Sequence, residues 1–408
     1  MKPLKNNTLT AGTAIADITP PLEVGLLTSS VQERWAPFES LRLPLKARVI
    51  YLQYGVEKFV LISLDLIGLT NDVVGGWDQF KSMLSDIIPP ERIVITCTHT
   101  HNAPETISLT DLYKKDQFHT WLNDVKAKLK IAISSAISDS CFCTISHGVD
   151  QLTGFSLQRR IPSEKGIIMS DSIQPIAEEL MNREPVDHRV HTLQINSLDG
   201  HAVATIVQAT CHPVHEMCLP HISPDFPGEL CNALDQSLGS GMSMFLNGAA
   251  ADTNPPTVSM GEAYAHEHGL ALANVVQQIV KKATPIDPPV LAFVHKVIKF
   301  DIRLHEEDFS NHTAYINILS LGHLALVFLP GEIFVETGLA IEAASPFEKT
   351  IIVGFSESSI GYVPSLKIFS EGGYETGPGK WSFLQQEAEG MLITEVSEML
   401  HELQTLIH

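Results

Sequence analysis

Hydrophobic and polar positions along this chain follow two periods, one typical of strands and one typical of helices. Residues 47–70 read as a strand, a turn at YGVEK and a second, apolar strand. Residues 262–283 repeat apolar positions at helical spacing and end in lysines, which suit the carbonyl end of a helix. Residues 294–305 alternate like an antiparallel strand. The pattern predicts strands and helices mixed along the whole chain.

Other segments follow the same two periods. The expected elements are a helix from residue 71 stopped by Pro89 and Pro90, a strand through residues 92–99, a helix at 120–138, a strand at 201–215 that runs into a proline turn, a strand, Pro-Gly turn and helix over 323–344, and an amphipathic helix from about Gln385 to Ile407. Antiparallel pairs mixed with helices predict a mixed α/β (α+β) fold, with mainly antiparallel central sheets flanked by helices. Without an internal repeat or a long linker, residues 1–408 are expected to form one domain.

Composition narrows the classes of function. The chain has 47 acidic and 27 basic residues, a formal net charge of −20, and no basic cluster, which argues against binding nucleic acid. No stretch resembles a signal peptide or reaches the ~18 apolar residues of a membrane span. Six cysteines without paired metal-ligand spacing predict reduced, buried thiols. We expect a cytoplasmic protein that acts on a small molecule, without stable membrane association. The oligomeric state is left open.

The motif THTHNAP carries two histidines, two positions apart, at the end of an apolar run. Residues two apart in a strand share a face, so a strand that reaches residue 99 would point His99 and His101 the same way. Two imidazoles on one face suit a single site, where one ligates a metal and the other hydrogen-bonds a substrate oxygen or a metal-bound water. Two surface histidines in a loop are the alternative.

Two further segments end apolar strands in the same way. His212 is followed by Pro213, and the first motif likewise ends in Pro104. Glu332 follows a Pro-Gly turn where the chain leaves the core, and a carboxylate there costs free energy to desolvate unless a cation pairs with it. An acid at a helix start is the alternative, and we assign that role to Glu336. Such strand ends predict loops that converge on one cleft.

Taken in order, these motifs resemble the catalytic domain of the neutral/alkaline ceramidases. The motifs are AGTAIADITPP, THTHNAP, CHPVHE, SPDFPG, NGAAADTNP, LPGEIFVETG, and GYVPS with EGGYET, and the resemblance runs from Ala11 to the final helix. It implies the ceramidase catalytic-domain fold over residues 1–408 and leaves no room for the C-terminal immunoglobulin-like domain of those enzymes. It also implies a single zinc ion (Zn²⁺) as cofactor, with the ligands His99, His212, Glu332 and Tyr362.

The same resemblance suggests further site residues. His101 would lie over the reacting carbonyl. Arg160, or its neighbour Arg159, would bind a polar group of the substrate, the alternative being a pair of solvated surface arginines. Tyr374 is an alternative to Tyr362 as ligand, or a catalytic acid or base.

The chain departs from the family where ceramidases carry Gly-Asp-Val-Ser-Pro-Asn. It reads ADTNPP at residues 251–256, so Asn254 stands at the position of the serine. An amide is a poor nucleophile, and we therefore expect a metal-activated water in place of a covalent serine mechanism. Asp252 is expected to orient a histidine, with an Asx turn as the alternative. Asp65, in a buried strand, is either a similar partner or a satisfied core acid.

These observations predict a zinc-dependent hydrolase that cleaves an amide or ester bond of a small substrate. His101 would stabilise the oxyanion or shuttle a proton. A metal-dependent lyase or glycan-active enzyme, with His101 and a tyrosine as acid and base, is one alternative. A non-catalytic binding protein is another, but such a protein need not keep His99, His212 and Glu332 together.

Overall fold

The computed structural model describes residues 8–25, 36–173, 175–237, 239, 241–304 and 311–407. Most of its strands belong to one large sheet. These strands are β1 (Thr10–Asp17), β3 (Lys46–Tyr54), β4 (Glu57–Leu64), β5 (Ile93–Cys97), β6 (Cys141–Gln151), β10 (Arg189–Ser197), β11 (Ala202–Ala209), β13 (Met242–Asn247), β15 (Thr284–Pro285), β16 (Leu291–Lys299), β17 (Thr313–Leu321), β18 (Leu324–Pro330) and β20 (Lys349–Ser356). Their order is β13-β11-β10-β6-β1-β3-β4-β5-β20-β18-β17-β16, with β15 paired to β6.

Most neighbours in this sheet are antiparallel, and β4–β5, β11–β13 and β18–β20 are parallel. The sheet folds over itself, because Ser243 and Phe245 of β13 accept side-chain hydrogen bonds from Arg48 of β3 (2.8 Å) and Ser63 of β4 (2.7 Å). An apolar core that includes Phe59, Met244 and Phe328 fills the space between the two halves.

Smaller elements join the strands of the large sheet. Short strand pairs are β2 (Ser40–Leu41) with β12 (His221–Ile222), β7 (Leu157–Gln158) with β14 (Thr253–Asn254), β8 (Arg160–Ser163) with β9 (Gly166–Met169), and β19 (Glu332–Ile333) with β21 (Tyr362–Val363). The 3-10 turns include η1 (Leu22–Val24), η2 (Pro90–Arg92), η3 (Leu112–Lys114), η4 (Ser170–Ser172) and η6 (Tyr374–Thr376).

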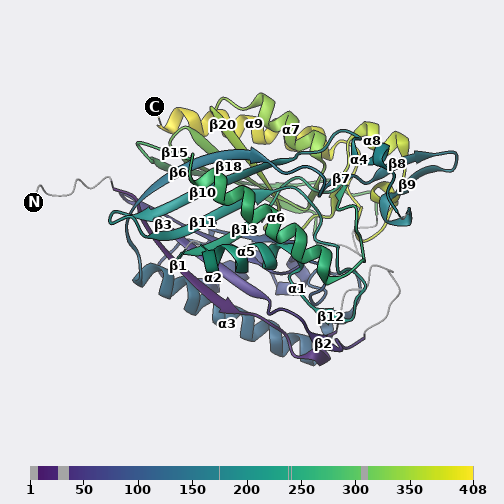
Figure 1. The fold of residues 1–408 in the computed structure, drawn as a ribbon, viewed down its shortest axis with the longest axis horizontal. Coiled ribbons are helices and arrows are strands. Elements are labelled where there is room, and N and C mark those ends of the chain that lie inside the picture. The colour runs from purple at the N-terminus through teal and green to yellow at the C-terminus, as the bar shows by residue number, and fades with distance from the viewer. Residues whose placement is uncertain are drawn as a thin grey trace, which may run out of the picture.

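Helices cover the outer faces of the sheet (Figure 1). They are α1 (Asn71–Val74), α2 (Trp77–Leu84), α3 (Asp116–Ser138), α4 (Glu178–Met181), α5 (Asp225–Ser237), α6 (Glu262–Val280), α7 (Val335–Ala344), α8 (Leu366–Glu371) and α9 (Ala388–Ile407). Helices α2 and α3 share a core with β1, β3 and β4, while α5 and α6 pack against β10, β11 and β13. Helices α7 and α9 cover β16, β17, β18 and β20. This arrangement confirms the predicted mixed fold with a mainly antiparallel sheet.

Several predicted elements are confirmed and others need correction. The first hairpin is β3–β4 around Gly55, and α3, α6, α9 and the β18–α7 unit lie where the pattern placed them. The strands expected over 201–215 and 294–305 are shorter, because β11 ends at Ala209 and β16 at Lys299. The single helix expected from residue 71 is instead α1 and α2, separated by Gly75 and Gly76, which both have positive φ. The strand expected over residues 92–99 ends at Cys97, two residues before His99.

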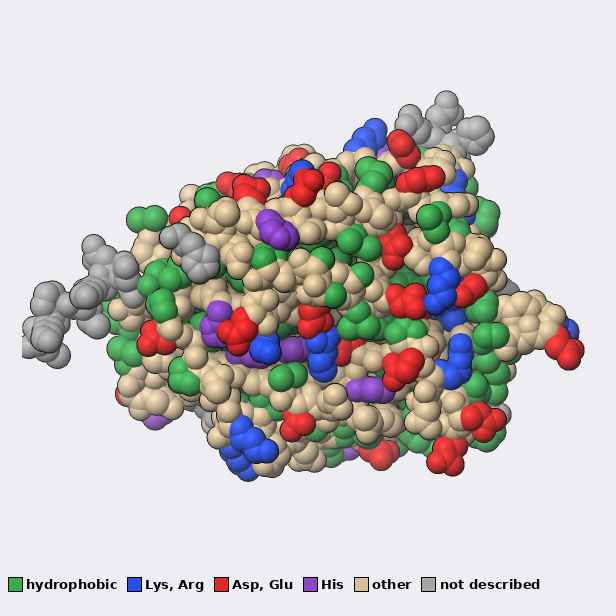
Figure 2. All heavy atoms as spheres, turned by 90° about the horizontal axis from the view of Figure 1, so that it is seen from above, with side chains coloured by type: hydrophobic (Ala, Val, Ile, Leu, Met, Phe, Trp, Pro, Cys, Tyr) green, Lys and Arg blue, Asp and Glu red, His purple; other side chains and the backbone are tan. Residues whose placement is uncertain are grey.

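The surface fits the acidic composition. On the face seen in Figure 2, acidic and basic side chains alternate without a broad basic patch among the described residues. Within the described part of the chain, no helix is both long and apolar enough to cross a membrane. Cys97, Cys143, Cys211 and Cys231 are buried. The expectation of buried thiols is wrong for the other two, because Cys141 begins β6 at its exposed end and Cys218 lies in an exposed turn.

Candidate metal centre

His99 follows β5 in a backbone conformation that is unusual for its residue type. Its N–H donates to the carbonyl of Leu66 at 2.9 Å, and its φ of 72° lies in the left-handed region, which non-glycine residues seldom adopt. The expected strand alternation therefore does not set the direction of this ring. His99 and His101 are nevertheless close, with ring centroids 5.0 Å apart and the rings nearly perpendicular.

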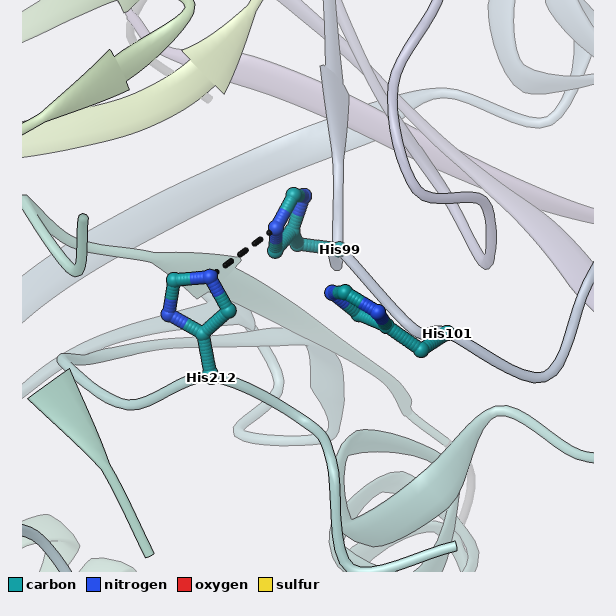
Figure 3. A group of neighbouring side chains, drawn as sticks. All are labelled: His99, His101 and His212. Atoms are coloured by element: carbon teal, nitrogen blue, oxygen red, sulfur yellow. Dashed lines mark hydrogen bonds between the residues drawn. The ribbon is translucent and has the colours of Figure 1, made fainter. Parts of the chain in front are cut away.

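Backbone carbonyls fix the tautomers of the two buried histidines. Nδ1 of His99 lies 2.5 Å from the carbonyl oxygen of Ile67, and Nδ1 of His212 lies 2.7 Å from that of Ala250. A carbonyl only accepts, so both Nδ1 atoms carry the proton and both Nε2 atoms keep a lone pair. These Nε2 atoms face each other at 3.2 Å (Figure 3). Two lone pairs in this arrangement need a cation or a proton donor between them.

The carboxylate of Glu332 lies beside the Nε2 atoms of His99 and His212. The parallel pair of β19 and β21 places Glu332 directly beside Tyr362. Oε2 of Glu332 lies 3.4 Å from Nε2 of His212 and 3.7 Å from Nε2 of His99. This oxygen is buried and has no hydrogen-bond partner among the described residues. Burial raises the pKa of the Glu332 carboxyl, and the neighbouring His99 and Arg159 oppose that shift.

These donors fit a metal ion. The carboxylate oxygen has no hydrogen-bond partner among the described residues, and Nε2 of His212 also lies 3.3 Å from Nη1 of Arg159. Together with the two imidazole nitrogens, this oxygen forms an N₂O set suited to zinc. Burial lowers the pKa of His99, His101 and His212 well below the usual value, so the rings are neutral, which is the form that binds metal. Tyr362, buried at 4% exposure beside Glu332, is placed to be a further ligand.

His101 belongs to the same group. One ligand atom from each of the three histidines lies within 4.8 Å of the others. Both ring nitrogens of His101 are buried without a hydrogen-bond partner in the described structure. His101 therefore lies at the centre. It could be a third nitrogen ligand of a metal ion, or it could face a metal ion that the other residues bind.

The two neighbouring arginines have different surroundings. Arg159 donates to the hydroxyl of Tyr362 at 2.9 Å and to Oε1 of Glu375 at 3.0 Å, and its Nη1 lies 3.3 Å from Nε2 of His212. Arg160 instead contacts Glu375, Glu371 and the carbonyl of Gly372. Successive residues of an extended chain point to opposite sides. Arg159 therefore faces the site, and our preference for Arg160 is corrected.

The acids expected to support the histidines have other partners. Oδ1 of Asp252 accepts from the N–H of Val335 at 3.0 Å and Oδ2 from Nε2 of Gln158 at 2.7 Å, so this carboxylate joins the start of α7 to β7. It orients neither site histidine, because their Nδ1 atoms bind carbonyls. Asp65 accepts from the N–H of Lys46 at 2.9 Å. It is a core acid, and burial raises its pKa to about 6.

A cavity of about 310 Å³ opens from the metal centre. Its wall includes Asn254, whose Nδ2 donates to Oγ of Ser170 at 3.4 Å. At its mouth the rings of Tyr374 and Trp381 stack, with centroids 5.5 Å apart and planes 4° apart. Tyr374 is 40% exposed, whereas the buried Tyr362 pairs directly with Glu332. The apolar part of the wall is formed by Ile67, Ile107, Leu109, Met169, Val214 and Met217.

Some residues of the centre were not found from the sequence. The ring of Phe355 stacks on His99, with centroids 4.0 Å apart, and no motif marks this residue. Glu375 was identifiable in principle, because it follows Tyr374 in the motif EGGYET. His215, in the motif CHPVHE with His212, contacts His268 at 3.0 Å and Thr257 at 2.8 Å and does not line the cavity.

Comparisons with known proteins define the fold. No family model matches the sequence, and no curated protein matches it in sequence. Two similar solved structures are the neutral ceramidase from Pseudomonas aeruginosa (TM-score 0.75, 15% identity, 97% of this chain and 74% of that chain) and a ceramidase complexed with C2 (TM-score 0.77, 16% identity, 98% and 76%). The chain therefore has a ceramidase-like fold.

Proposed function

We propose that this protein is a zinc-dependent hydrolase that cleaves an amide or ester bond of a small substrate. The convergence of Nε2 of His99, Nε2 of His212 and Oε2 of Glu332, three buried lone-pair atoms no more than 3.7 Å apart, carries this proposal. Two neutral imidazoles and a carboxylate form one of the recurring donor sets of catalytic zinc sites. A zinc ion there would act as a Lewis acid that polarises a carbonyl and makes water nucleophilic near neutral pH.

Other residues of the cavity have distinct roles in this proposal. His101 is free to hydrogen-bond the carbonyl oxygen or to carry a proton to the leaving group, because neither ring nitrogen has another partner among the described residues. Arg159 holds the hydroxyl of Tyr362 and is itself held by Glu375. Asn254 lines the cavity but offers no nucleophile, which supports attack by water.

The cavity supports a small substrate. Its volume of about 310 Å³ is near the lower end of the range for small-molecule pockets, ~300–1,000 Å³. The apolar wall suits an acyl group, and the stacked rings of Tyr374 and Trp381 offer a flat surface to the other part of the substrate. The likeness to ceramidases, one of them complexed with C2, supports an N-acyl amide as the first class to test.

The decisive experiment combines metal analysis with product analysis. We expect about one zinc per chain in the purified protein, measured by inductively coupled plasma mass spectrometry. N-acyl amides and esters of increasing acyl length should then be hydrolysed with uptake of one ¹⁸O from labelled water. An unsaturated product without ¹⁸O would instead indicate the lyase alternative. Absence of zinc from an active protein would contradict the proposal.

A further inference from the structure

Three residues at the ends of β5 and β20 have left-handed backbone conformations. They are His99 (φ 72°), Phe355 (φ 51°) and Glu357 (φ 56°). None is a glycine, and such conformations persist only where the surrounding structure imposes them. The ring of Phe355 stacks on that of His99 at 4.0 Å and 25°. The strained segment 355–357 is therefore in direct contact with a proposed metal ligand.

This segment lies where two parts of the large sheet meet. Strands β5 and β20 are joined by a single residue pair, Thr96 with Ser356. Ser356 also pairs with Pro330 of β18, and the N–H of Phe355 donates to the carbonyl of Gly331 at 3.1 Å. His99 follows β5, and Glu332 follows β18. The relative position of these two residues therefore depends on this narrow junction.

Glu357 strengthens the junction with both its backbone and its side chain. Its N–H donates to the carbonyl of Ile95 at 2.6 Å, and its Oε1 accepts from the N–H of Ile95 at 3.1 Å. The carboxylate thus supplies an acceptor that the neighbouring backbone does not. Its Oε2 accepts from Nζ of Lys81 and Nε1 of Trp77, each at 2.8 Å, and both donors belong to α2.

The pair of Lys81 and Glu357 is costly to bury. The two side chains are 5% and 0% exposed, and a buried ion pair of this kind often stabilises a fold no better than apolar residues of similar size. Such a pair can instead contribute by fixing one arrangement of the groups that it joins, here α2 and the end of β20. The titratable side chain of Tyr315 interacts electrostatically with Glu357 and with Asp78.

We propose that Glu357, held by Lys81 and Trp77, is a positioning residue for the metal centre. It fixes the β5–β20 junction and, through the stacked ring of Phe355, the ring of His99 relative to Glu332. The identity of the metal rests on the proposed function. The positioning of the His99 ring does not, because it is a property of the metal-free protein.

The variant Glu357→Gln tests this role with two readouts. Zinc affinity, measured by competition with a chromophoric chelator, should fall by ~10- to 100-fold, as it does when a residue that orients a metal ligand is lost. In metal-free protein labelled with ¹³C at the histidine ring, the His99 signal should move, because the ring current of Phe355 then acts on it differently. His99→Gln assigns that signal.

A matched control separates positioning from stability. Asp235→Asn removes the negative charge that faces Arg48 in another partly buried pair, 2.9 Å long, that joins β3 to α5. This control should lower the unfolding temperature while the zinc affinity and the His99 signal stay those of the wild type. If Glu357→Gln does not fold, Lys81→Met gives the deciding measurements, because it removes one donor that holds Glu357 and leaves the ring of Phe355 in place.

The outcomes distinguish the two proposals. A wild-type protein that binds no zinc would overturn the proposed function, and a displaced His99 signal in Glu357→Gln would still support the positioning role. Zinc affinity within twofold of wild type together with an unmoved His99 signal, in the variant that folds, would overturn the positioning role. Equal loss of zinc affinity in Asp235→Asn would overturn it as well.

Discussion

His101 differs from the other two histidines of the centre, because no carbonyl fixes its tautomer and both its nitrogens lack partners among the described residues. If it acts on the substrate, His101→Ala should keep its zinc and lose about 10²-fold in kcat, a typical contribution of oxyanion stabilisation or proton transfer. Metal content and kcat, measured on the same preparation, check this.

A second substitution at the same position separates donor from proton carrier. His101→Gln keeps a hydrogen-bond donor but cannot titrate. Recovery of much of the lost rate would indicate a donor, and no recovery would indicate a proton shuttle. Loss of zinc from His101→Ala would show instead that all three histidines are ligands.

The three proposed ligands should behave alike. His99→Ala, His212→Ala and Glu332→Ala should each strip the zinc, since an incomplete shell binds far more weakly. His201→Ala is the control, because that ring is 75% exposed on the surface. Equilibrium dialysis against zinc followed by metal analysis gives the measurement. Stoichiometric zinc in all three variants would place the metal elsewhere.

Asn254 tests the departure from a serine mechanism. Asn254→Ala should keep most of the activity, because the side chain lines the cavity without supplying a nucleophile. Asn254→Ser should accumulate no covalent intermediate when the reaction is quenched and examined by intact-protein mass spectrometry. An acyl group trapped on any hydroxyl side chain would contradict this expectation.

At the scale of single residues, the sequence identified those that lie in recognisable motifs and failed where local geometry decides. His99, His212 and Glu332 converge as expected. The choice between Arg159 and Arg160 depends on which way one extended residue points, and one residue of register reverses it. The role of Asp252 was misjudged because the backbone carbonyls of Ile67 and Ala250, which orient the histidines, leave no mark in a sequence.

At the scale of elements, the stacked pair of Tyr374 and Trp381 is the part of the cavity wall best placed to contact substrate. Trp381→Ala should raise KM by about tenfold with little change in kcat, because stacking of this kind binds ground state and transition state alike. Steady-state kinetics checks this. Leu366→Ala, an exposed apolar position of α8 outside the cavity, should leave both constants unchanged.

Helices and hairpins that have a periodic pattern in their own sequence were predictable. The pairing of strands that are distant in the sequence was not. The β3–β4 hairpin and helices α3, α6 and α9 follow from periodicity within a short window. The junction of β5 with β20 joins Thr96 to Ser356, and nothing within either strand specifies the other. Likewise, Gly75 and Gly76 mark a break between α1 and α2 that the apolar spacing alone conceals.

At the scale of the whole molecule, helices cover both outer faces of a sheet that folds over itself. Sheets flanked by helices were predicted from the mixture of strand and helix periods, but the folding of one sheet over itself was not. The order of the strands was beyond inference, because it depends on side-chain packing between segments that are distant in sequence.

That distance has a consequence for kinetics. His99 and His212 are 113 residues apart in sequence, and Glu332 arrives from a third region of the chain. Contacts of such long range usually form late in folding. Zinc should therefore slow unfolding in denaturant and leave the refolding rate unchanged, since it stabilises interactions that are absent from the transition state. Stopped-flow measurements of unfolding and refolding, with zinc and with chelator, would show whether the metal binds only after the fold has formed.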